Sequence, residues 1–480
     1  MRKRVERIVS ILILTLIVII SVSKVSDLLQ LKESDLRYSS FFAEENQIDV
    51  LFLGASHVSH VIFPMEIWND YGITSYNLAG DGNAIPTSYW ILVNALDYQM
   101  PKVVVMDIYD LLPDRKFSDA WGMVHESLDA IPLSVNKYRM VMDLIDDENV
   151  TDENGTLVYD KRWELLFDLG EYHTRWNSLE KGDFDSQSEL ELYSAVWKGQ
   201  EPYFDIAQRE EHIYTESDGL FYDEIAKDYL ERMIQLCADK NIDLLLINTG
   251  YDCNDDAKYF ADSINIMAEQ YGISYIDFTA LNIINYESDL ASGGENTHLN
   301  FSGAEKITSF LGRILSEQYQ LSDHRSDEAY GAWWSDYQHF IDRKAGYLRG
   351  QRSLDFYLLL LADDDYNIII ETRDMNIVNE NNNYAMLKNL GIDMDEYGNN
   401  NNLLAINMSN GEISYLFNNY ESGLSLQSVL GEISLQGYEN SYGMYLNGEE
   451  MYVTSSNDWA RIKITVINRD SGEVVDVHNF

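Results

Sequence analysis

A serine and a histidine that lie far apart in the sequence have the side chains that acyl transfer needs. Ser56 follows the apolar run Val50–Leu53 and a tight turn, and His298 comes much later, with Glu295 three residues before it. A serine nucleophile needs a base to accept its proton, a carboxylate to orient the base, and N–H donors for the oxyanion. We therefore predict that Ser56 is the nucleophile, His298 the base and Glu295 the orienting carboxylate.

Each of these residues also has a simpler explanation. Serine is a favoured residue just before a helix, so Ser56 could act only as a helix N-cap. The chain has 9 histidines, so His298 could be an ordinary loop residue. Ser56 and His298 can act together in catalysis only if the fold brings the two segments together.

The succession of elements predicts such a fold. Short apolar runs alternate with helical patterns, which indicates an α/β fold with a doubly wound, mostly parallel sheet of about five strands. We expect strands at Val50–Leu53, 74–78, 102–108, 242–248 and 273–278. We expect helices at Pro64–Tyr71, 89–96, 230–239, 258–271 and 302–319. Ligands of such sheets bind beyond the carboxyl ends of the strands, where Ser56 and His298 would both lie.

A long segment, residues 109–229, separates the third and fourth of these strands. It far exceeds an ordinary crossover, and it is polar, helical in pattern and rich in aromatic residues. We expect it to be a cap insertion that folds over the carboxyl edge of the sheet within an α/β domain at 48–320. Such a cap would shape the access of a substrate.

The bulk composition excludes some classes of function. The 480 residues include 80 acidic and 34 basic side chains, a net charge of −46, which argues against nucleic acid as a partner. With 45% hydrophobic residues the chain is nevertheless that of a folded protein. We find no metal-binding motif, no phosphate-binding glycine loop and no sign of a cofactor. The two cysteines, Cys237 and Cys253, are expected to be buried free thiols, with a single disulfide as the alternative.

The N-terminus has the pattern of a membrane anchor. A basic segment, residues 1–7, precedes an almost wholly apolar run from Ile8 to Ser23. We expect residues 1–24 to form a cytoplasmic tail and signal-anchor helix, with the rest of a bacterial protein outside the membrane. Secretion after signal cleavage is the alternative. Residues 25–47 are expected to form an exposed helical linker.

The chain changes character after residue 320. Residues 321–362 are charged and aromatic and predict a helical connector, and residues 363–480 contain short strand patterns separated by turn signals. We expect a second, β-rich accessory domain. A carbohydrate-binding role and a structural or dimerising role fit its sequence equally well.

Three blocks of this chain resemble the SGNH/GDSL hydrolase family. They are Gly54-Ala55-Ser56 after the first strand, Asn77-Leu78-Ala79-Gly80-Asp81-Gly82 after the second, and Glu295-x-x-His298 before the last helix. They are most similar to the membrane-anchored subset that acts on acyl groups of cell-surface polymers. The resemblance implies that Ser56 attacks the acyl carbonyl, that His298 activates it, and that the backbone N–H groups of Ser56 and Gly82 bind the oxyanion.

The sequence departs from the family pattern at the third block. The family supplies an oxyanion-hole asparagine after the third strand, but the sequence here is Asp107-Ile108-Tyr109-Asp110-Leu111. Asn83, beside Gly82, could take its place. Losing one oxyanion donor typically costs about 10²–10³ in rate, so an impaired, binding-only protein is an alternative to an enzyme.

Four further residues are candidates for substrate binding. These are Asn83 and His57 near the serine, and Arg175 and Trp176 in the cap. Arg175 beside an aromatic ring would suit a sugar carboxylate or phosphate, although a surface ion pair also explains it. His57 could line the pocket or hold the start of the helix.

The segment from MYLNGEEMYV to the last residue resembles the end of an interleukin-like EMT inducer (PANDER-like) domain, and the resemblance covers residues 363–480. That resemblance implies a small β-sandwich. Together the resemblances predict a membrane-anchored serine esterase or O-acyltransferase that acts on an acylated glycan or other cell-envelope polymer. A membrane-bound acyltransferase is a possible partner, and the alternative is a glycan-binding accessory protein of such a system.

Overall fold

The computed structural model describes most of the chain, with gaps that fall mainly in the cap and the C-terminal region. The described residues are 2–29, 32–111, 121–145, 162–166, 173–179, 197–208, 223–250, 255–291, 298–362, 365–372, 375–380, 382–393, 403–409, 412–418, 424–428, 431–438, 441–455, 461–469 and 471–480. Glu295 and Cys253 lie outside them, so the roles expected for these two residues stay predictions. Cys237 is buried, as expected for a structural thiol.

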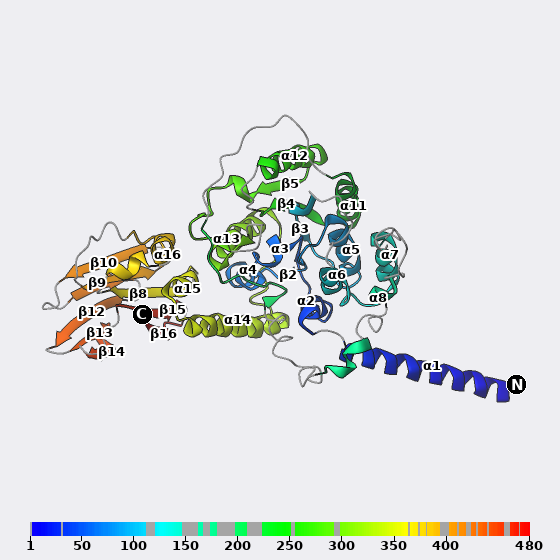
Figure 1. Cartoon of the computed structure of the whole chain (residues 1–480), viewed down its shortest axis with the longest axis horizontal. Helices are drawn as coiled ribbons and strands as arrows, with labels where there is room; N and C mark the ends of the chain where they lie inside the picture. Colours follow the sequence, from blue (N-terminus) through cyan, green and yellow to red (C-terminus); the bar gives the residue numbers. More distant parts are fainter. Residues whose placement is uncertain are drawn as a thin grey trace.

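The centre of the molecule is a five-stranded parallel sheet, which confirms the predicted α/β class (Figure 1). Its strand order is β2-β1-β3-β4-β5, one of the two common doubly wound orders. The strands are β1 (Val50–Leu53), β2 (Ser75–Asn77), β3 (Val103–Asp107), β4 (Asp243–Asn248) and β5 (Ser274–Asp277). β1 is buried along its whole length because β2 and β3 flank it and helices cover its faces, which explains why its sequence is wholly apolar.

Helices surround this sheet. They are α3 (Ser56–Ser59), α4 (Pro64–Tyr71), α5 (Ile85–Ala95), α11 (Glu224–Lys240), α12 (Asp255–Tyr271) and α13 (Phe301–Gln318). Of the helices that begin earlier than expected, α5 and α11 differ most from the prediction. α5 includes Pro86 in its first turn. A proline is tolerated there because it has no backbone N–H and the first turn of a helix needs none for its hydrogen bonds. α11 begins after Asp223, whose side chain accepts a hydrogen bond from the backbone N–H of Ala226.

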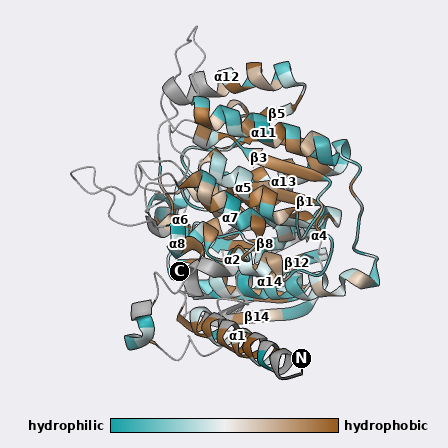
Figure 2. Ribbon diagram, turned by 90° about the vertical axis from the view of Figure 1, so that its right-hand side faces the viewer, coloured by the Kyte–Doolittle hydropathy of each residue, from teal (hydrophilic) through white to brown (hydrophobic). Residues whose placement is uncertain are grey.

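The N-terminal region has two helices. α1 (Arg2–Leu29) contains the window Val9–Ser26, which is long and apolar enough to cross a membrane or to be a signal sequence, and none of it is buried. In Figure 2, most of the α1 ribbon has the colour of hydrophobic residues. α2 (Lys32–Phe42) follows directly, and the expectation of an exposed linker is wrong for it. Tyr38 and Phe41 are buried in the core, where Phe41 packs edge-on against Tyr76.

The structure describes several segments of the cap insertion. They are α6 (Trp121–Leu128), α7 (Val135–Leu144), α8 (Arg162–Leu166), η3 (His173–Asn177) and residues 197–208. α7 packs on α5, and α6 packs on α2. The last segment reaches the carboxyl edge of the sheet, where the Glu201 N–H donates to the Ser59 carbonyl over 2.9 Å.

The C-terminal region begins with the expected helices, α14 (Gly331–Gly350) and α15 (Leu354–Leu359). Two antiparallel sheets follow, with orders β10-β9-β8-β15-β16 and β11-β12-β13-β14. The strands are β8 (Tyr366–Thr372), β9 (Leu403–Ser409), β10 (Glu412–Asn418), β11 (Leu424–Ser428), β12 (Gly431–Tyr438), β13 (Ser441–Leu446), β14 (Glu449–Ser455), β15 (Ile462–Asn468) and β16 (Val474–Asn479). The prediction of a β-rich region is therefore confirmed. It also contains the short helix α16 (Asn383–Asn389), which we did not expect.

Candidate active site

The structure brings Ser56 and His298 into direct contact. The His298 Nε2 atom lies 2.8 Å from the Ser56 Oγ atom, a normal hydrogen-bond distance. Ser56 is the first residue of α3, just beyond the carboxyl end of β1. His298 lies on the two-residue strand β7 (His298–Leu299), which pairs with β6 (Leu290–Ala291) and fixes the backbone of the histidine. The serine hydroxyl can therefore donate to Nε2 when Nδ1 carries the ring hydrogen.

A sharp turn allows the serine to stand at this edge. Gly54 has a φ of +147°, which L side chains rarely adopt, and a Cβ there would lie 2.9 Å from the Asp107 Cβ. Any side chain at this position would therefore push β1 away from the end of β3. The chain turns from strand to helix within two residues, which leaves Ser56 at the start of the helix.

Aromatic rings enclose the His298 side chain. The His57 ring stacks on the His298 ring, with ring centroids 4.5 Å apart. The Tyr109 ring packs on His57 in turn, with ring centroids 3.9 Å apart. The Tyr203 ring meets His298 at a steep angle, 5.3 Å away. His57 is therefore a packing partner of the candidate base, and with only 1% of its surface exposed it offers little area to a substrate. Gly250 makes room for this stack, because a Cβ there would lie 2.1 Å from Tyr109.

Residues 79–83, here named the glycine loop, lie beside the serine. The Gly80 N–H donates to the Gly54 carbonyl over 3.2 Å, which ties the loop to the turn before Ser56. Gly82 has a φ of +66°, a conformation that favours glycine, and it lacks a side chain that would shield its N–H. Arg37 of α2 holds the loop from the other side, with Nη1 2.5 Å from the Ala79 carbonyl.

The side chain of Asn83 contacts α2. Its side chain is buried, and its Nδ2 donates to the Tyr38 hydroxyl over 3.2 Å. The hydroxyl of Tyr38 in turn reaches the Leu78 carbonyl at 3.3 Å. The described contacts of Asn83 therefore hold the glycine loop in place, and the role of oxyanion donor stays a prediction.

A set of charged side chains surrounds the glycine loop. His60 places Nε2 3.1 Å from Asp81 Oδ1 and Nδ1 against the Glu201 carbonyl. Both partners accept hydrogen bonds when Asp81 is ionised, and the tautomer of His60 decides which of its nitrogens donates. Arg37 forms an ion pair with Glu201, with 2.9 Å between Nη2 and Oε2. Asp81, His60, Glu201 and Arg37 thus form one connected set of polar contacts at the loop.

These contacts keep Asp81 ionised. Burial alone would raise the pKa of this carboxyl, but the hydrogen bond and charge of His60, together with the charge of Arg37, hold it well below its usual range. Ser59 also donates to Asp81 over 3.2 Å. The pair of Asp81 and His60 therefore joins the glycine loop to α3, the helix that begins with Ser56.

Asp107, at the end of β3, titrates differently. Burial raises its pKa to about 6, and hydrogen bonds from Thr249 and from the backbone offset only part of this effect. The Thr249 Oγ1 atom lies 2.7 Å from Asp107 Oδ2 and 3.1 Å from the backbone carbonyl of His57. Asp107 occupies the region where the family pattern would supply its third block, and it is linked to the backbone of the residue after Ser56.

The cap residues predicted to bind substrate lie elsewhere. The Arg175 Nη1 atom donates to the carbonyl of Leu29, the last residue of α1, and Trp176 is 68% exposed beside it. The structure therefore does not bring Arg175 and Trp176 together with Ser56. Their binding role stays a prediction. In the described part of the chain, no group of three or more His, Cys, Asp or Glu side chains is arranged to hold a metal ion.

Sequence reasoning missed several residues that build this site. Arg37 and Tyr38 lie in the segment we read as a linker, and Tyr109, Tyr203 and Thr249 follow strands or lie in the cap. The sequence LRYSSFF does place apolar side chains at helical spacing, and that signal could have indicated a buried face for α2. The tyrosines gave no comparable signal, because the chain has 33 of them.

Comparison with known proteins adds little to this geometry. No family model matches the chain, and no curated protein matches it either. Among solved structures, the chain is similar to a crystal structure from Bacteroides fragilis of a protein named a "putative acylhydrolase", with 10% sequence identity and a TM-score of 0.28. The similarity covers 60% of this chain and 99% of the other. At that TM-score it carries no argument about activity, and the site geometry has to carry the assignment.

Proposed function

We propose that this protein is a membrane-anchored, extracytoplasmic serine esterase or O-acyltransferase of the SGNH type, acting on acyl groups of a cell-envelope glycan. One observation carries the proposal: a serine and a histidine from distant parts of the chain lie 2.8 Å apart at the carboxyl edge of a parallel sheet. Ligands of this sheet class bind at that edge. The resemblance of the three sequence blocks supports the choice of ester chemistry and of an envelope substrate.

The reaction would proceed in two halves. His298 Nε2 accepts the Ser56 proton while Oγ attacks the ester carbonyl, and the N–H groups of Ser56 and Gly82 stabilise the oxyanion. The alcohol then leaves with the proton from His298, and an acyl-serine remains. Water or a sugar hydroxyl attacks the acyl-serine, His298 accepts its proton, and that proton returns to Ser56 Oγ as the acyl group leaves. Glu295 would orient His298 through Nδ1.

A fluorophosphonate probe tests for the activated serine directly. We expect the full chain in detergent to gain the mass of one phosphonyl group, Ser56→Ala to abolish this gain, and His298→Gln to slow it by at least about 10³. Ser316→Ala is the control, because Ser316 is an exposed serine near the end of α13. Equal labelling of Ser56→Ala and wild type would refute the catalytic assignment.

A second candidate function is glycan binding without catalysis, and one feature favours it. A cavity of about 520 Å³ lies between α4, α13 and the C-terminal region. Two aromatic rings, Tyr71 and Phe310, line it together with charged side chains such as Asp365 and Arg469. Aromatic faces combined with charged hydrogen-bonding groups suit a sugar. Failure of the wild-type chain to react with the probe, together with binding of envelope glycan fragments, would favour this candidate.

A further inference from the structure

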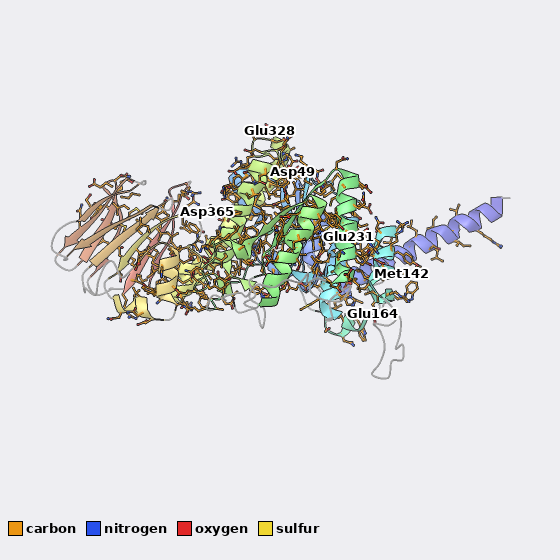
Figure 3. All side chains as sticks on the ribbon, turned by 90° about the horizontal axis from the view of Figure 1, so that it is seen from above. Asp49, Met142, Glu164, Glu231, Glu328 and Asp365 are labelled. Carbon is orange, nitrogen blue, oxygen red and sulfur yellow. The ribbon has the colours of Figure 1, made fainter. Side chains whose placement is uncertain are left out.

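Five exposed apolar side chains lie on α7, α8, η3 and the turn before α7. We name them the apolar cap face, and they are Leu133, Val135, Tyr138, Trp163 and Trp176. In Figure 1, α7 and α8 lie on the same side of the α/β core as α1, and Figure 2 looks onto this side. Figure 3, seen from above, places the label of Met142, on α7, on the side toward α1.

The helix α7 is apolar on two sides. Met140, Val141 and Leu144 are buried against the core. Val135 and Tyr138 lie three residues apart, which places them together on another face of the helix, whereas Met142 is partly buried against the core. Val135 and Tyr138 are 67% and 51% exposed. A surface helix that already buries one apolar face usually turns polar side chains outward, so this second face indicates a further contact.

The turn η3 fixes part of the apolar cap face at the end of α1. The hydrogen bond from Arg175 to the Leu29 carbonyl joins the two elements, and Trp176 is exposed next to it. The apolar window of α1 ends at Ser26, three residues earlier, which is about 4.5 Å along a helix axis. Trp176 is thus held near the level where the polar boundary of a bilayer would begin, and tryptophan is enriched at that boundary.

The charge of these elements also fits a lipid surface. Of the basic residues of α7, α8 and η3, Lys137 is buried and donates to the Asp129 carbonyl, whereas Arg139, Arg162 and Arg175 are not buried. The same elements contain two acidic residues, Asp143 and Glu164, of which Glu164 is buried and Asp143 accepts hydrogen bonds from Trp90 and Tyr229. In a chain with a net charge of −46, this local excess of basic groups is compatible with lipid phosphates.

We infer that the apolar cap face lies in the interfacial layer of the same bilayer that α1 crosses. The inference rests on the anchoring part of the proposed function. The continuity of η3 with the end of α1 favours a lipid bilayer over a second protein as the occupant. The cap would then be held against the membrane at two points, α1 and the apolar cap face. The site at Ser56 would work close to the lipid surface.

Tryptophan quenching by lipids brominated on their acyl chains tests this inference. The chain has 9 tryptophans and none of them is in α1, so quenching reports on the rest of the chain. The full chain is reconstituted into phosphatidylcholine vesicles with or without brominated acyl chains. We expect quenching of wild type and its loss in the double variant Trp163→Phe/Trp176→Phe. Trp334→Phe is the control, because Trp334 packs on Trp68 of α4 and should leave the quenching unchanged.

Vesicle flotation and the fluorophosphonate probe separate the possible outcomes. Flotation without quenching of wild type would overturn the inference and leave the anchor intact. Quenching that survives in the double variant would also overturn it, because other tryptophans would then be responsible. A chain that does not float would refute the anchoring and the inference together, while the labelling of Ser56 still reports separately on catalysis. Quenching that is lost only in the double variant, while that variant still floats with the vesicles, supports the inference.

Discussion

At the scale of single residues, aromatic rings pack around the candidate base. His298 lies between Ser56, which its Nε2 contacts, and His57, whose ring covers its face. The backbone of His57 in turn contacts Thr249, and Thr249 contacts Asp107. A change of protonation at Asp107 can therefore reach the residue next to the nucleophile.

Asp107 makes stability depend on pH in a predictable direction. Its folded pKa of about 6 lies above the ordinary value of 3.8, so the folded state binds this proton more tightly. This contribution is fully present below about pH 4 and is lost as the pH rises through 6. The loss amounts to about 3 kcal/mol by pH 7, since one pKa unit corresponds to about 1.4 kcal/mol.

The measurement compares urea unfolding of wild type and Asp107→Asn between pH 4 and pH 7. We expect the wild type to lose stability relative to the variant across this range, because the amide can keep the contact with Thr249 and does not titrate. Parallel curves for the two proteins would show that Asp107 titrates at an ordinary pKa.

At the scale of elements, α2 is part of the site. Arg37 donates to the Ala79 carbonyl, and Tyr38 contacts both Leu78 and Asn83. These bonds cover the strand end and the glycine loop that would carry the oxyanion donor Gly82. The helix that follows the apolar helix α1 thus takes part in shaping the candidate oxyanion hole.

Removing α2 should therefore impair the serine. We expect a chain that begins at residue 30 to react with the fluorophosphonate probe and a chain that begins at residue 45 to lose most of that reaction. Because the shorter chain also loses buried core, Tyr38→Phe in the full chain is the sharper variant. It keeps the ring and removes the hydroxyl, and we expect labelling several-fold slower with little change in unfolding temperature. Unchanged labelling of Tyr38→Phe would limit α2 to a packing role.

Local patterns predicted the elements better than they predicted their surroundings. The run VLFL indicated a doubly buried strand, and β1 is buried between β2 and β3 because its apolar composition tolerates no other place. The same reading placed Ser56 and His298 at one sheet edge, since parallel strands share the direction of their ends. It failed for Arg37 and Tyr38, because the helical spacing of α2 can indicate a buried face but does not show that residues 78–83 lie against it.

At the scale of the whole molecule, the buried cation Lys344 connects the α/β core with the C-terminal sheets. The Lys344 Nζ atom of α14 is in ionic contact with Glu66 of α4 and with Asp365 at the start of the C-terminal sheets, at 3.2 Å from the latter. Glu305 of α13 is a third carboxylate, at 3.7 Å. Removing the cation would leave three carboxylates facing one another in a largely buried place.

Lys344→Met should therefore destabilise the protein strongly. Breaking a buried ion pair by removal of one partner costs about 3–5 kcal/mol, and we expect a loss of this size in urea unfolding. Arg461→Met is the matched control, because Arg461 pairs with Glu380 over 2.7 Å on the surface and its loss should cost at most about 1 kcal/mol. Equal losses for the two variants would show that Lys344 contributes no more than a surface pair.

The distance along the chain between Ser56 and His298 has a consequence for biogenesis. A ribosome makes Ser56 early, whereas β7 and α13, which carry and follow His298, come 242 residues later. Until β7 and α13 dock, Ser56 lacks its contact with His298. A nascent chain that is exported from its N-terminus would thus carry an inert serine, and completion of the fold would itself switch on the reactivity.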